Sequence, residues 1–275
     1  MATDRVRTVL TTGANSGIGL ACALEVARKG FRSVGSVRSK AKAKAVQRAA
    51  EEAGVKVETV LLDVTDAGRG EEVVRDLDLY GLVNNAGYGV TGAIEDVGDD
   101  EARAVMETMV LAPMRLARAA LPAMRARGDG RIVNISSIYG RATSPLTGWY
   151  QGSKHALEAL SDALRMEVAS AGAKVVLVEP GGFRTGIWEE LERDVAKRTG
   201  SRYSSSYRRA MSLTRLSSPV MGDPSRVAKV VAGVMSGRSP RARYLVGYDA
   251  QALALWDRFT PTPVKDLATR VGLGL

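Results

Sequence analysis

The stretch Thr12-Gly13-Ala14-Asn15-Ser16-Gly17-Ile18-Gly19 decides the fold. It follows a short apolar run at residues 7–12, and it leads into residues 17–29, where apolar side chains recur at helical spacing. Glycines let the backbone turn tightly and approach a phosphate, and the first turn of a helix offers unpaired N–H groups. The spacing G-x3-G-x-G differs from the G-x-G-x-x-G fingerprint of dinucleotide-binding proteins. The stretch therefore predicts a phosphate-binding turn, with a plain strand-to-helix connection as the alternative.

Short apolar runs and helical segments alternate along the rest of the chain. The predicted strands cover residues 7–12, 33–37, 55–62, 79–83, 132–135 and 175–178. The predicted helices cover residues 17–29, 41–53, 70–77 and 99–127, followed by a helix that carries Tyr150. Continuous apolar strands separated by helices indicate a parallel sheet covered on both faces. We predict one α/β domain over residues 1–275, a doubly wound (Rossmann-type) sheet of about seven strands with ligands at their carboxyl ends.

Composition narrows the class of protein. A chain of 275 residues with 45% hydrophobic content can bury a full core. The single cysteine, Cys22, excludes an intramolecular disulfide and suits a reducing compartment. We see no signal sequence and no apolar run long enough for a membrane span, so we expect a soluble, cytoplasmic protein. The net charge is +9, but the basic residues are spread along the chain and no nucleic-acid module motif occurs, which argues against nucleic-acid binding.

Tyr150 and Lys154 form a candidate acid–base pair, with Ser137 thirteen residues before the tyrosine. Residues four apart on a helix share a face, so an ammonium can lie beside a phenol. A free tyrosine has a pKa of about 10, and a nearby positive charge favours the phenolate and brings the group closer to a useful range. Ser137 could orient a substrate oxygen. Such a pair also arises by chance, and a solvated helix face is the alternative.

Five motifs in this order resemble those of the short-chain dehydrogenase/reductase family. Residues 12–19 are similar to the family's TGxxxGxG cofactor turn, and residues 63–64 to the acidic pair that contacts adenine. Residues 84–87 match its NNAG motif, and residues 180–185 are similar to its PGxxxT segment. Residues 135–137, together with Tyr150 and Lys154, resemble its catalytic set. Residues 243–247 resemble the last strand of its hydroxysteroid and retinol dehydrogenase branch. The resemblance implies an oxidoreductase that acts on a CH–OH group, and a homodimer or homotetramer.

The resemblance also implies roles for particular residues. Tyr150 would exchange a proton with the substrate oxygen as hydride moves to or from nicotinamide C4. Lys154 would hold the nicotinamide ribose and lower the tyrosine pKa, and Ser137, rather than Ser136, would bond the carbonyl oxygen. The residues expected at the cofactor are Gly13, Asn15, Ser16, Gly17, Ile18, Gly19, Arg38, Asp63, Val64, Asn85, Ala86, Gly87, Tyr150, Lys154, Pro180, Gly181 and Thr185. No metal is expected, since His155 is the single histidine.

One residue departs from the family's pattern. Met109 stands where the family usually has an asparagine, and a thioether cannot replace the hydrogen bonds of an amide. The resemblance implies that the asparagine's main-chain carbonyl holds a relay water to the lysine, and Met109 keeps that carbonyl. Alternatively, the helix kink is lost and proton relay is slowed. We expect activity to be retained.

The end of the second strand indicates the cofactor. Enzymes that use NAD generally place an acidic residue there to bind the ribose 2′-hydroxyl. This chain has Arg38 instead, whose planar fork can pair with a 2′-phosphate, with Ser39 or Lys40 as helpers. A surface arginine at a helix start is the alternative. We predict NADP(H).

The substrate is less constrained. Residues 186–222 are predicted to form a lid, and their Trp188, Tyr203, Tyr207 and Met211 suit a bulky apolar ketone or alcohol, although helix-packing residues would look the same. Arginines in this lid form a solvated face or meet an anionic or acyl-carrier-linked oxo substrate. Residues 240–275 would close the pocket, pack on a partner subunit or touch a membrane surface. A non-catalytic NADP-sensing or interaction protein is the second function class.

Overall fold

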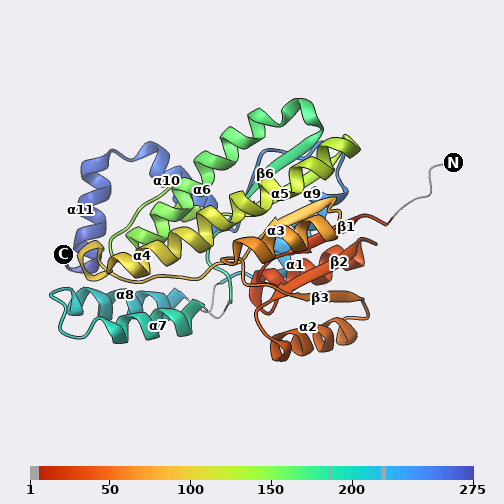
Figure 1. The fold of residues 1–275 in the computed structure, drawn as a ribbon. Helices are drawn as coiled ribbons and strands as arrows, with labels where there is room; N and C mark the ends of the chain where they lie inside the picture. Colours follow the sequence, from red (N-terminus) through yellow and green to blue (C-terminus); the bar gives the residue numbers. More distant parts are fainter. Residues whose placement is uncertain (1–5, 186, 218–220) are drawn as a thin grey trace.

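The structure, a computed structural model, describes residues 6–185, 187–217 and 221–275. Within these residues, seven parallel strands form one sheet in the order β3-β2-β1-β4-β5-β6-β7 (Figure 1). The strands are β1 (Thr8–Thr11), β2 (Arg32–Val37), β3 (Val57–Leu61), β4 (Gly81–Asn84), β5 (Gly130–Ile135), β6 (Ala173–Pro180) and β7 (Arg243–Val246). The predicted α/β class, the doubly wound sheet and its strand number are confirmed.

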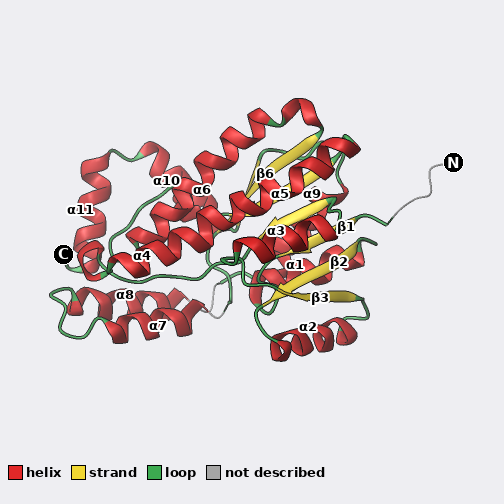
Figure 2. Cartoon of the chain, in the orientation of Figure 1, coloured by secondary structure: helices red, strands yellow, loops and turns green. Residues whose placement is uncertain are grey.

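Helices cover both faces of the sheet (Figure 2). One face carries α1 (Gly17–Arg28), α2 (Lys40–Glu52) and α9 (Ser225–Ser236). The other face carries α3 (Ala67–Asp76), α5 (Ala112–Arg127) and α6 (Gly148–Glu167). Every residue of β4 and β5 is buried, which explains why both strands are rich in apolar residues, although Asn84, Arg131 and Asn134 are buried there too. The approach of α9 to the sheet is close, since a Cβ on Gly81 would lie 2.7 Å from the sulfur of Met235.

The remaining helices gather at the end of the molecule toward which the strand arrows point (Figure 1). They are α4 (Asp99–Met106), α7 (Ile187–Lys197), α8 (Ser204–Ser217), α10 (Tyr248–Phe259) and α11 (Thr262–Leu273). The carboxyl ends of parallel strands form the ligand-binding edge of such sheets. These helices therefore surround the edge at which the sequence places its site residues.

Two predicted helices have different bounds in the structure. Helix α3 begins at Ala67 rather than at residue 70, because the side chain of Asp66 caps it by accepting a hydrogen bond from the Arg69 N–H at 3.0 Å. The helix predicted over residues 99–127 is interrupted by a π-helix, η2 (Glu107–Leu111), between α4 and α5. Pro113, in the first turn of α5, cannot supply the N–H that a regular α-helix needs there.

Strand order places the glycine-rich turn at a special point of the sheet. β1 lies between β2 and β4, so the chain winds one way from β1 to β3 and the other way from β4 to β7. In open parallel sheets, ligands bind in the crevice outside the strands at this reversal. The turn after β1 and Asn85 after β4 both lie there.

Candidate active site

Glycine is required at three positions of the turn after β1. Gly13 and Gly17 adopt positive φ angles of 64° and 53°, which side chains other than glycine rarely adopt. A Cβ on Gly19 would lie 2.3 Å from the carbonyl oxygen of Gly13 and 2.4 Å from Nδ2 of Asn85. Both distances are far below van der Waals contact. The turn therefore folds back on the first turn of α1 with no room for a side chain.

Hydrogen bonds between the ends of β1 and β4 hold the turn in place. The N–H groups of Asn85 and Ala86 donate to Oγ1 of Thr12 at 2.9 and 3.0 Å. Nδ2 of Asn85 also donates, to the main-chain carbonyl of Thr12 at 2.9 Å. Thr12 was not among the predicted site residues, and its position at the start of the glycine motif was the available signal.

A second set of polar contacts joins β4 and β5 to α6, next to these hydrogen bonds. Nδ2 of Asn84 donates to Oδ1 of Asn134 at 2.8 Å, and Nδ2 of Asn134 donates to Oγ of Ser161 at 2.7 Å. All three side chains are buried. These hydrogen bonds hold β4, β5 and α6 together behind the site.

The start of α1 is suited to an anion. Ser16 is its N-cap but makes no capping hydrogen bond through its side chain, and no acidic residue lies in the first turn. The N–H groups there keep the partial positive charge of the helix dipole. Thr185, from the loop after β6, lies beside Gly17, 3.1 Å from where a Cβ would be. This cradle fits the diphosphate of a dinucleotide, while Ile18 packs its side chain against the core.

Arg38 lies exposed at the end of β2, and the residues expected to help it have other contacts. Ser39 caps α2 by accepting a hydrogen bond from the N–H of Lys42 at 3.3 Å. Among the described residues, no ion pair with Arg38 occurs. Burial alone would raise the pKa of Asp63, but hydrogen bonds from Thr65 and the charge of Arg38 bring it below its ordinary value.

The three residues expected to be catalytic come together at the end of β5. Nζ of Lys154 donates to the carbonyl of Ile135 at 2.9 Å and lies 5.8 Å from the centroid of the Tyr150 ring. Ser137 is buried at the N-cap of a short 3-10 helix, η3 (Ile138–Gly140), and Tyr150 is partly exposed. The hydroxyl of Ser137 also lowers the pKa of Tyr150, against the effect of burial. The arrangement presents two hydroxyls and one ammonium on one side of α6.

Burial dominates the ionisation of this pair. It raises the pKa of Tyr150 above that of an ordinary phenol, and the hydrogen bond with Ser137 opposes the rise. Burial also lowers the pKa of Lys154 to about 8, and the charge of Glu158 opposes that change. In the protein alone the pKa of Tyr150 is therefore raised, whereas the sequence predicts that Lys154 lowers it. Lys154 itself is half charged in the mildly alkaline range.

A buried charge cluster lies directly behind Lys154. Glu179 has no exposed surface and accepts from Arg141 at 2.9 Å, and it lies 3.2 Å from Arg243. Arg243 also pairs with Glu158 at 3.1 Å. Burial raises the pKa of Glu158, while Ser136 and Arg243 oppose the rise. Oγ of Ser136 is buried without a hydrogen-bond partner among the described residues, and Ser137 is the serine whose hydroxyl affects the pKa of the tyrosine.

Met109 lies inside the π-helix that separates α4 from α5. In α-helical register the donor to the Met109 carbonyl would be residue 113, and Pro113 has no N–H. The irregular backbone is thus retained with methionine in place of asparagine, so the alternative in which the helix kink is lost is wrong. The side chain is buried, and its sulfur lies 3.1 Å from where a Cβ on Gly87 would be. Such single π-turns are frequent at functional sites.

The loop after β6 is tied to α10 by an aspartate that the sequence did not single out. Asp249, in the first turn of α10, accepts a hydrogen bond from the N–H of Gly182. A Cβ on Gly181 would lie 2.3 Å from its Oδ2, and one on Gly247 would lie 2.4 Å from its Oδ1. The carboxylate therefore fills space that only glycines leave open. This loop begins with the predicted cofactor residue Gly181, directly after Pro180 at the end of β6.

The predicted lid is held in place by its own aromatic residues. Residues 186 and 218–220 of that lid and the side chain of Trp188 lie outside the described part of the structure. Tyr207 is buried, donates to Asp96 at 2.6 Å and accepts from the N–H of Ala93 at 2.7 Å. Tyr203 packs in the same small apolar cluster. These two tyrosines are packing residues, which was the alternative to substrate contact.

Two of the lid arginines are committed to ion pairs. Arg198 pairs with both carboxylate oxygens of Glu101 at 2.7 and 2.8 Å and reaches the carbonyl of Thr91 at 3.3 Å. Arg215 pairs with Glu192 at 2.6 Å. Arg198 therefore anchors the lid to α4 and is occupied by that contact.

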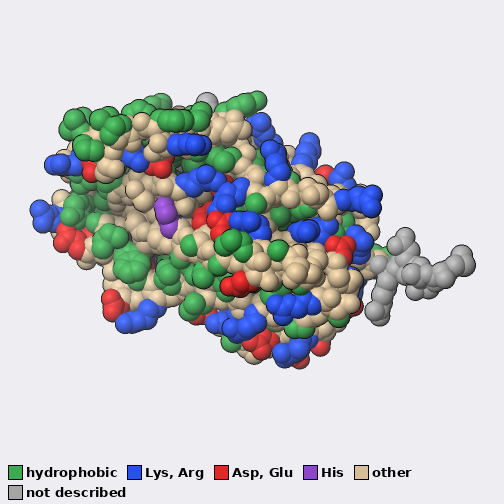
Figure 3. All heavy atoms as spheres, turned by 90° about the horizontal axis from the view of Figure 1, so that it is seen from above, with side chains coloured by type: hydrophobic (Ala, Val, Ile, Leu, Met, Phe, Trp, Pro, Cys, Tyr) green, Lys and Arg blue, Asp and Glu red, His purple; other side chains and the backbone are tan. Residues whose placement is uncertain are grey.

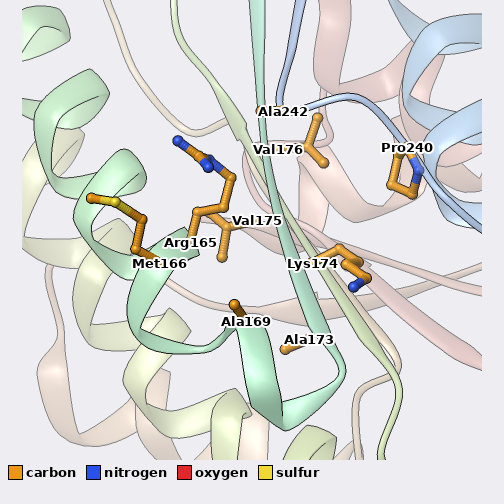
Figure 4. A pocket seen from close by; sticks show the side chains of 9 residues that line it. All are labelled: Arg165, Met166, Ala169, Ala173, Lys174, Val175, Val176, Pro240 and Ala242. Carbon is orange, nitrogen blue, oxygen red and sulfur yellow. The ribbon is translucent and has the colours of Figure 1, made fainter.

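A hollow of about 250 Å³ lies at the opposite end of the sheet (Figure 4). Residues 173–176 in its wall belong to the start of β6, whereas the candidate site lies at the carboxyl ends of the strands. Its other lining residues are Arg165, Met166, Ala169, Pro240 and Ala242. Arg165 is already paired with Asp162 at 2.9 Å. The hollow is separate from the chemistry described above.

Two further findings concern the described residues alone. None of their helices combines the length and apolar character needed to cross a membrane. No cluster of three His, Cys, Asp or Glu side chains in this part of the chain is placed to hold a metal ion.

Comparison with known proteins agrees with the fold. Residues 7–196 match the family model described as short chain dehydrogenase. Human retinol dehydrogenase 5 is 32% identical over 94% of this chain and 86% of its own. A short-chain dehydrogenase from Streptomyces avermitilis, 31% identical, superposes with a TM-score of 0.79 over 99% of this chain and 98% of its own. Actinorhodin polyketide ketoreductase, solved with NADPH, is 28% identical with a TM-score of 0.78 over 92% and 99%.

Proposed function

Because the chain belongs to the short-chain dehydrogenase family, whose members act on alcohols and ketones, we propose that it transfers hydride between NADP(H) and a ketone or secondary alcohol. The observation that carries this proposal is the convergence of Ser137, Tyr150 and Lys154 beside the glycine turn, with the lysine ammonium 5.8 Å from the tyrosine ring. The cofactor residues predicted from the sequence keep that role as part of the proposal.

Each of the three side chains has a separate task. In reduction, Tyr150 gives its proton to the substrate oxygen, and in oxidation it takes that proton back. Ser137 donates a hydrogen bond to the same oxygen and holds it within reach of the phenol. Lys154 supplies the positive charge that favours the phenolate when the proton leaves. When bound, the nicotinamide supplies or accepts the hydride.

The preference for NADP(H) rests on Arg38. Its side chain is exposed at the end of β2, and no described carboxylate forms an ion pair with it. A free guanidinium at this point can bind the 2′-phosphate in a bidentate manner. A structural relative with a similar fold was solved with NADPH, which supports the same choice.

An apolar substrate is the second part of the proposal. Trp149 and Tyr150 pack against the apolar cluster that contains Val90, Val105 and Met109, so the surroundings of the phenol are hydrophobic. The similarity to human retinol dehydrogenase 5 supports a lipid-like alcohol or ketone. Residues 186–222 would then act as the lid and residues 240–275 as a substrate or packing segment. The ion pair of Arg198 with Glu101 weakens the alternative of an anionic substrate.

The decisive experiment is Tyr150→Phe, assayed as NADPH oxidation over a panel of steroid, retinoid, quinone and oxoacyl ketones. We expect turnover to fall by about 10²–10⁴-fold, while NADPH binding is unchanged. Tyr244→Phe, a hydroxyl deletion on β7, serves as the control and should keep full activity. Unchanged turnover in Tyr150→Phe would remove that residue from the mechanism. Tight NADPH binding by the parent protein without turnover of any substrate would favour the sensor function.

Assembly and location stay predictions. The homodimer or homotetramer that the family resemblance implies can be measured by light scattering. The cytoplasmic location can be measured by fractionation of cells that express the protein.

A further inference from the structure

The turn that precedes α6 contains a leucine in a strained backbone conformation. Leu146 has a φ angle of 70°, in the left-handed region that residues other than glycine rarely adopt. With Pro145 before it, the segment 144–147 has the features of a type II turn, which normally places glycine at this position. Strained residues of this kind persist only where their surroundings hold them, and they gather at functional sites. Tyr150 follows Leu146 by four residues.

The side chain of Gln151 holds this turn in its strained form. Gln151 is 1% exposed, and its Oε1 accepts a hydrogen bond from the N–H of Ser144 at 3.0 Å. Its Nε2 donates to Oγ of Ser144 at 2.9 Å and to Oγ1 of Thr147 at 2.6 Å. One buried amide therefore binds both ends of the turn, and it belongs to the residue that directly follows Tyr150 in α6.

The start of the same loop is bound by the next turn of α6. Gln151 and His155 are four positions apart, so their side chains share a face of the helix. Nδ1 of His155 lies 3.0 Å from the carbonyl of Gln151, and Nε2 lies 3.3 Å from the carbonyl of Arg141, where the loop between η3 and α6 begins. Figure 3 shows this side of the molecule, with the histidine side chain at its surface. One face of α6 thus holds the loop, beside the face that carries Tyr150.

The lid explains why this position is a leucine. Leu146 is 4% exposed and packs in a small apolar cluster with Ala93 and Tyr207, of which Tyr207 belongs to α8. The carbonyl of Leu146 also accepts a hydrogen bond from the N–H of Gly92 at 2.7 Å. A glycine would adopt the same φ angle without strain, but it would leave the cluster without an apolar side chain. Burial of the leucine against the lid therefore offsets the strain in its backbone.

We propose that Gln151 is a positioning residue that couples the lid to Tyr150. By holding residues 144–147 in the strained turn, Gln151 keeps Leu146 in the lid cluster and seats the lid beside the start of α6. The seated lid bounds the space in which a bulky apolar substrate meets Tyr150. The part that concerns the substrate rests on the proposed function, whereas the hold on the lid is a property of the protein alone.

The first measurement needs no substrate. Gln151→Leu keeps the size of the side chain and removes all three hydrogen bonds to the turn. We expect hydrogen–deuterium exchange to rise about tenfold or more in residues 91–97 and 194–210, with little change in β2 and β3. Gln47→Leu is the matched control, since Gln47 is exposed on α2. A uniform rise across the sheet would show a contact that only stabilises the fold, and unchanged exchange in the lid would also overturn the proposal.

The second measurement separates binding of the substrate from binding of the cofactor. In Gln151→Leu, we expect the KM for a bulky apolar ketone to rise about tenfold or more, while the KM for a small water-soluble ketone and the NADPH affinity stay within about twofold. Leu146→Gly should show the same pattern, because glycine accepts the turn but loses the contact with the lid. An equal loss with both ketones would contradict the proposal.

The two variants and the two measurements cover the remaining outcomes. If Gln151→Leu does not fold, Leu146→Gly tests the same coupling, and an unchanged KM for the bulky ketone in that variant would overturn it. If the parent protein turns over no ketone, the proposed function fails, but the exchange measurement still decides whether Gln151 holds the lid.

Discussion

Substitution of Gly19 by alanine tests the packing of the glycine turn. The new Cβ would lie 2.3 Å from the Gly13 carbonyl oxygen and 2.4 Å from Nδ2 of Asn85. Ordinary contact begins about 1 Å further out, so the turn or Asn85 must move by about that distance. Neither can move freely, because Asn85 bonds Thr12 through both its main chain and its side chain.

The magnitude follows from three contributions. Overpacking of a tight site costs about 1–3 kcal/mol, and a weakened Asn85 hydrogen bond adds about 1 kcal/mol. Alanine recovers about 0.5–1 kcal/mol as a better helix residue than glycine. We expect Gly19→Ala to lower the free energy of unfolding by about 1–3.5 kcal/mol and to weaken NADPH binding, because the turn can no longer close around a phosphate.

Urea unfolding followed by circular dichroism and a fluorescence titration with NADPH would measure both effects. Gly233→Ala is the matched control: Gly233 lies on α9, is exposed, and no neighbouring atom lies within 4 Å of where its Cβ would be. That variant should gain about 0.5–1 kcal/mol. A Gly19→Ala protein as stable as its parent, with unchanged NADPH affinity, would refute the packing argument.

Three more substitutions test other parts of the site. Arg38→Asp should weaken NADPH binding about tenfold or more relative to NADH binding. Arg48→Asp, on the exposed side of α2, is the control and should not change this ratio. Equal effects of Arg38→Asp on the binding of both cofactors would contradict the role of Arg38. Met109→Asn should leave turnover within about threefold, because the π-helix is already present, and a large rise would show an impaired relay. Glu158→Gln removes a negative charge that raises the Lys154 pKa, so that pKa should fall further below about 8. The alkaline limb of the pH–rate profile should then move to lower pH. A limb that stays in place would show that the charge of Glu158 does not control the ionisation of Lys154 during turnover.

Local sequence signals were sufficient for the sheet and the glycine turn. Most residues of β1, β2, β4, β5 and β6 are buried, so these strands appear as short stretches rich in apolar residues, and the glycines mark where backbone must approach backbone. The spacing of Tyr150 and Lys154 by one helical turn predicts that they share a face of a helix, but the inclusion of Ser137 depended on the resemblance to the family's motifs.

Pairings between distant residues could not be predicted in this way. Arg198 and Glu101 lie 97 positions apart, and Asp249 lies 67 positions from the Gly182 N–H that it accepts from. Which carboxylate meets which arginine depends on the strand order, and no local pattern encodes it. Tyr207 was ambiguous for the same reason, since an aromatic residue at helical spacing can face either a substrate or a neighbouring loop.

The space between Asp249 and the glycines beside it constrains any rearrangement of this protein by recombination. Gly181 and Gly247 each leave room for one carboxylate oxygen, and Asp249 occupies both spaces. These residues come from two segments that a designer would treat as separate modules, the loop after β6 and the C-terminal helices. A chimera that takes the C-terminal segment from one relative and the loop from another would inherit a clash or a void. Gly181, Gly247 and Asp249 therefore have to be transferred together.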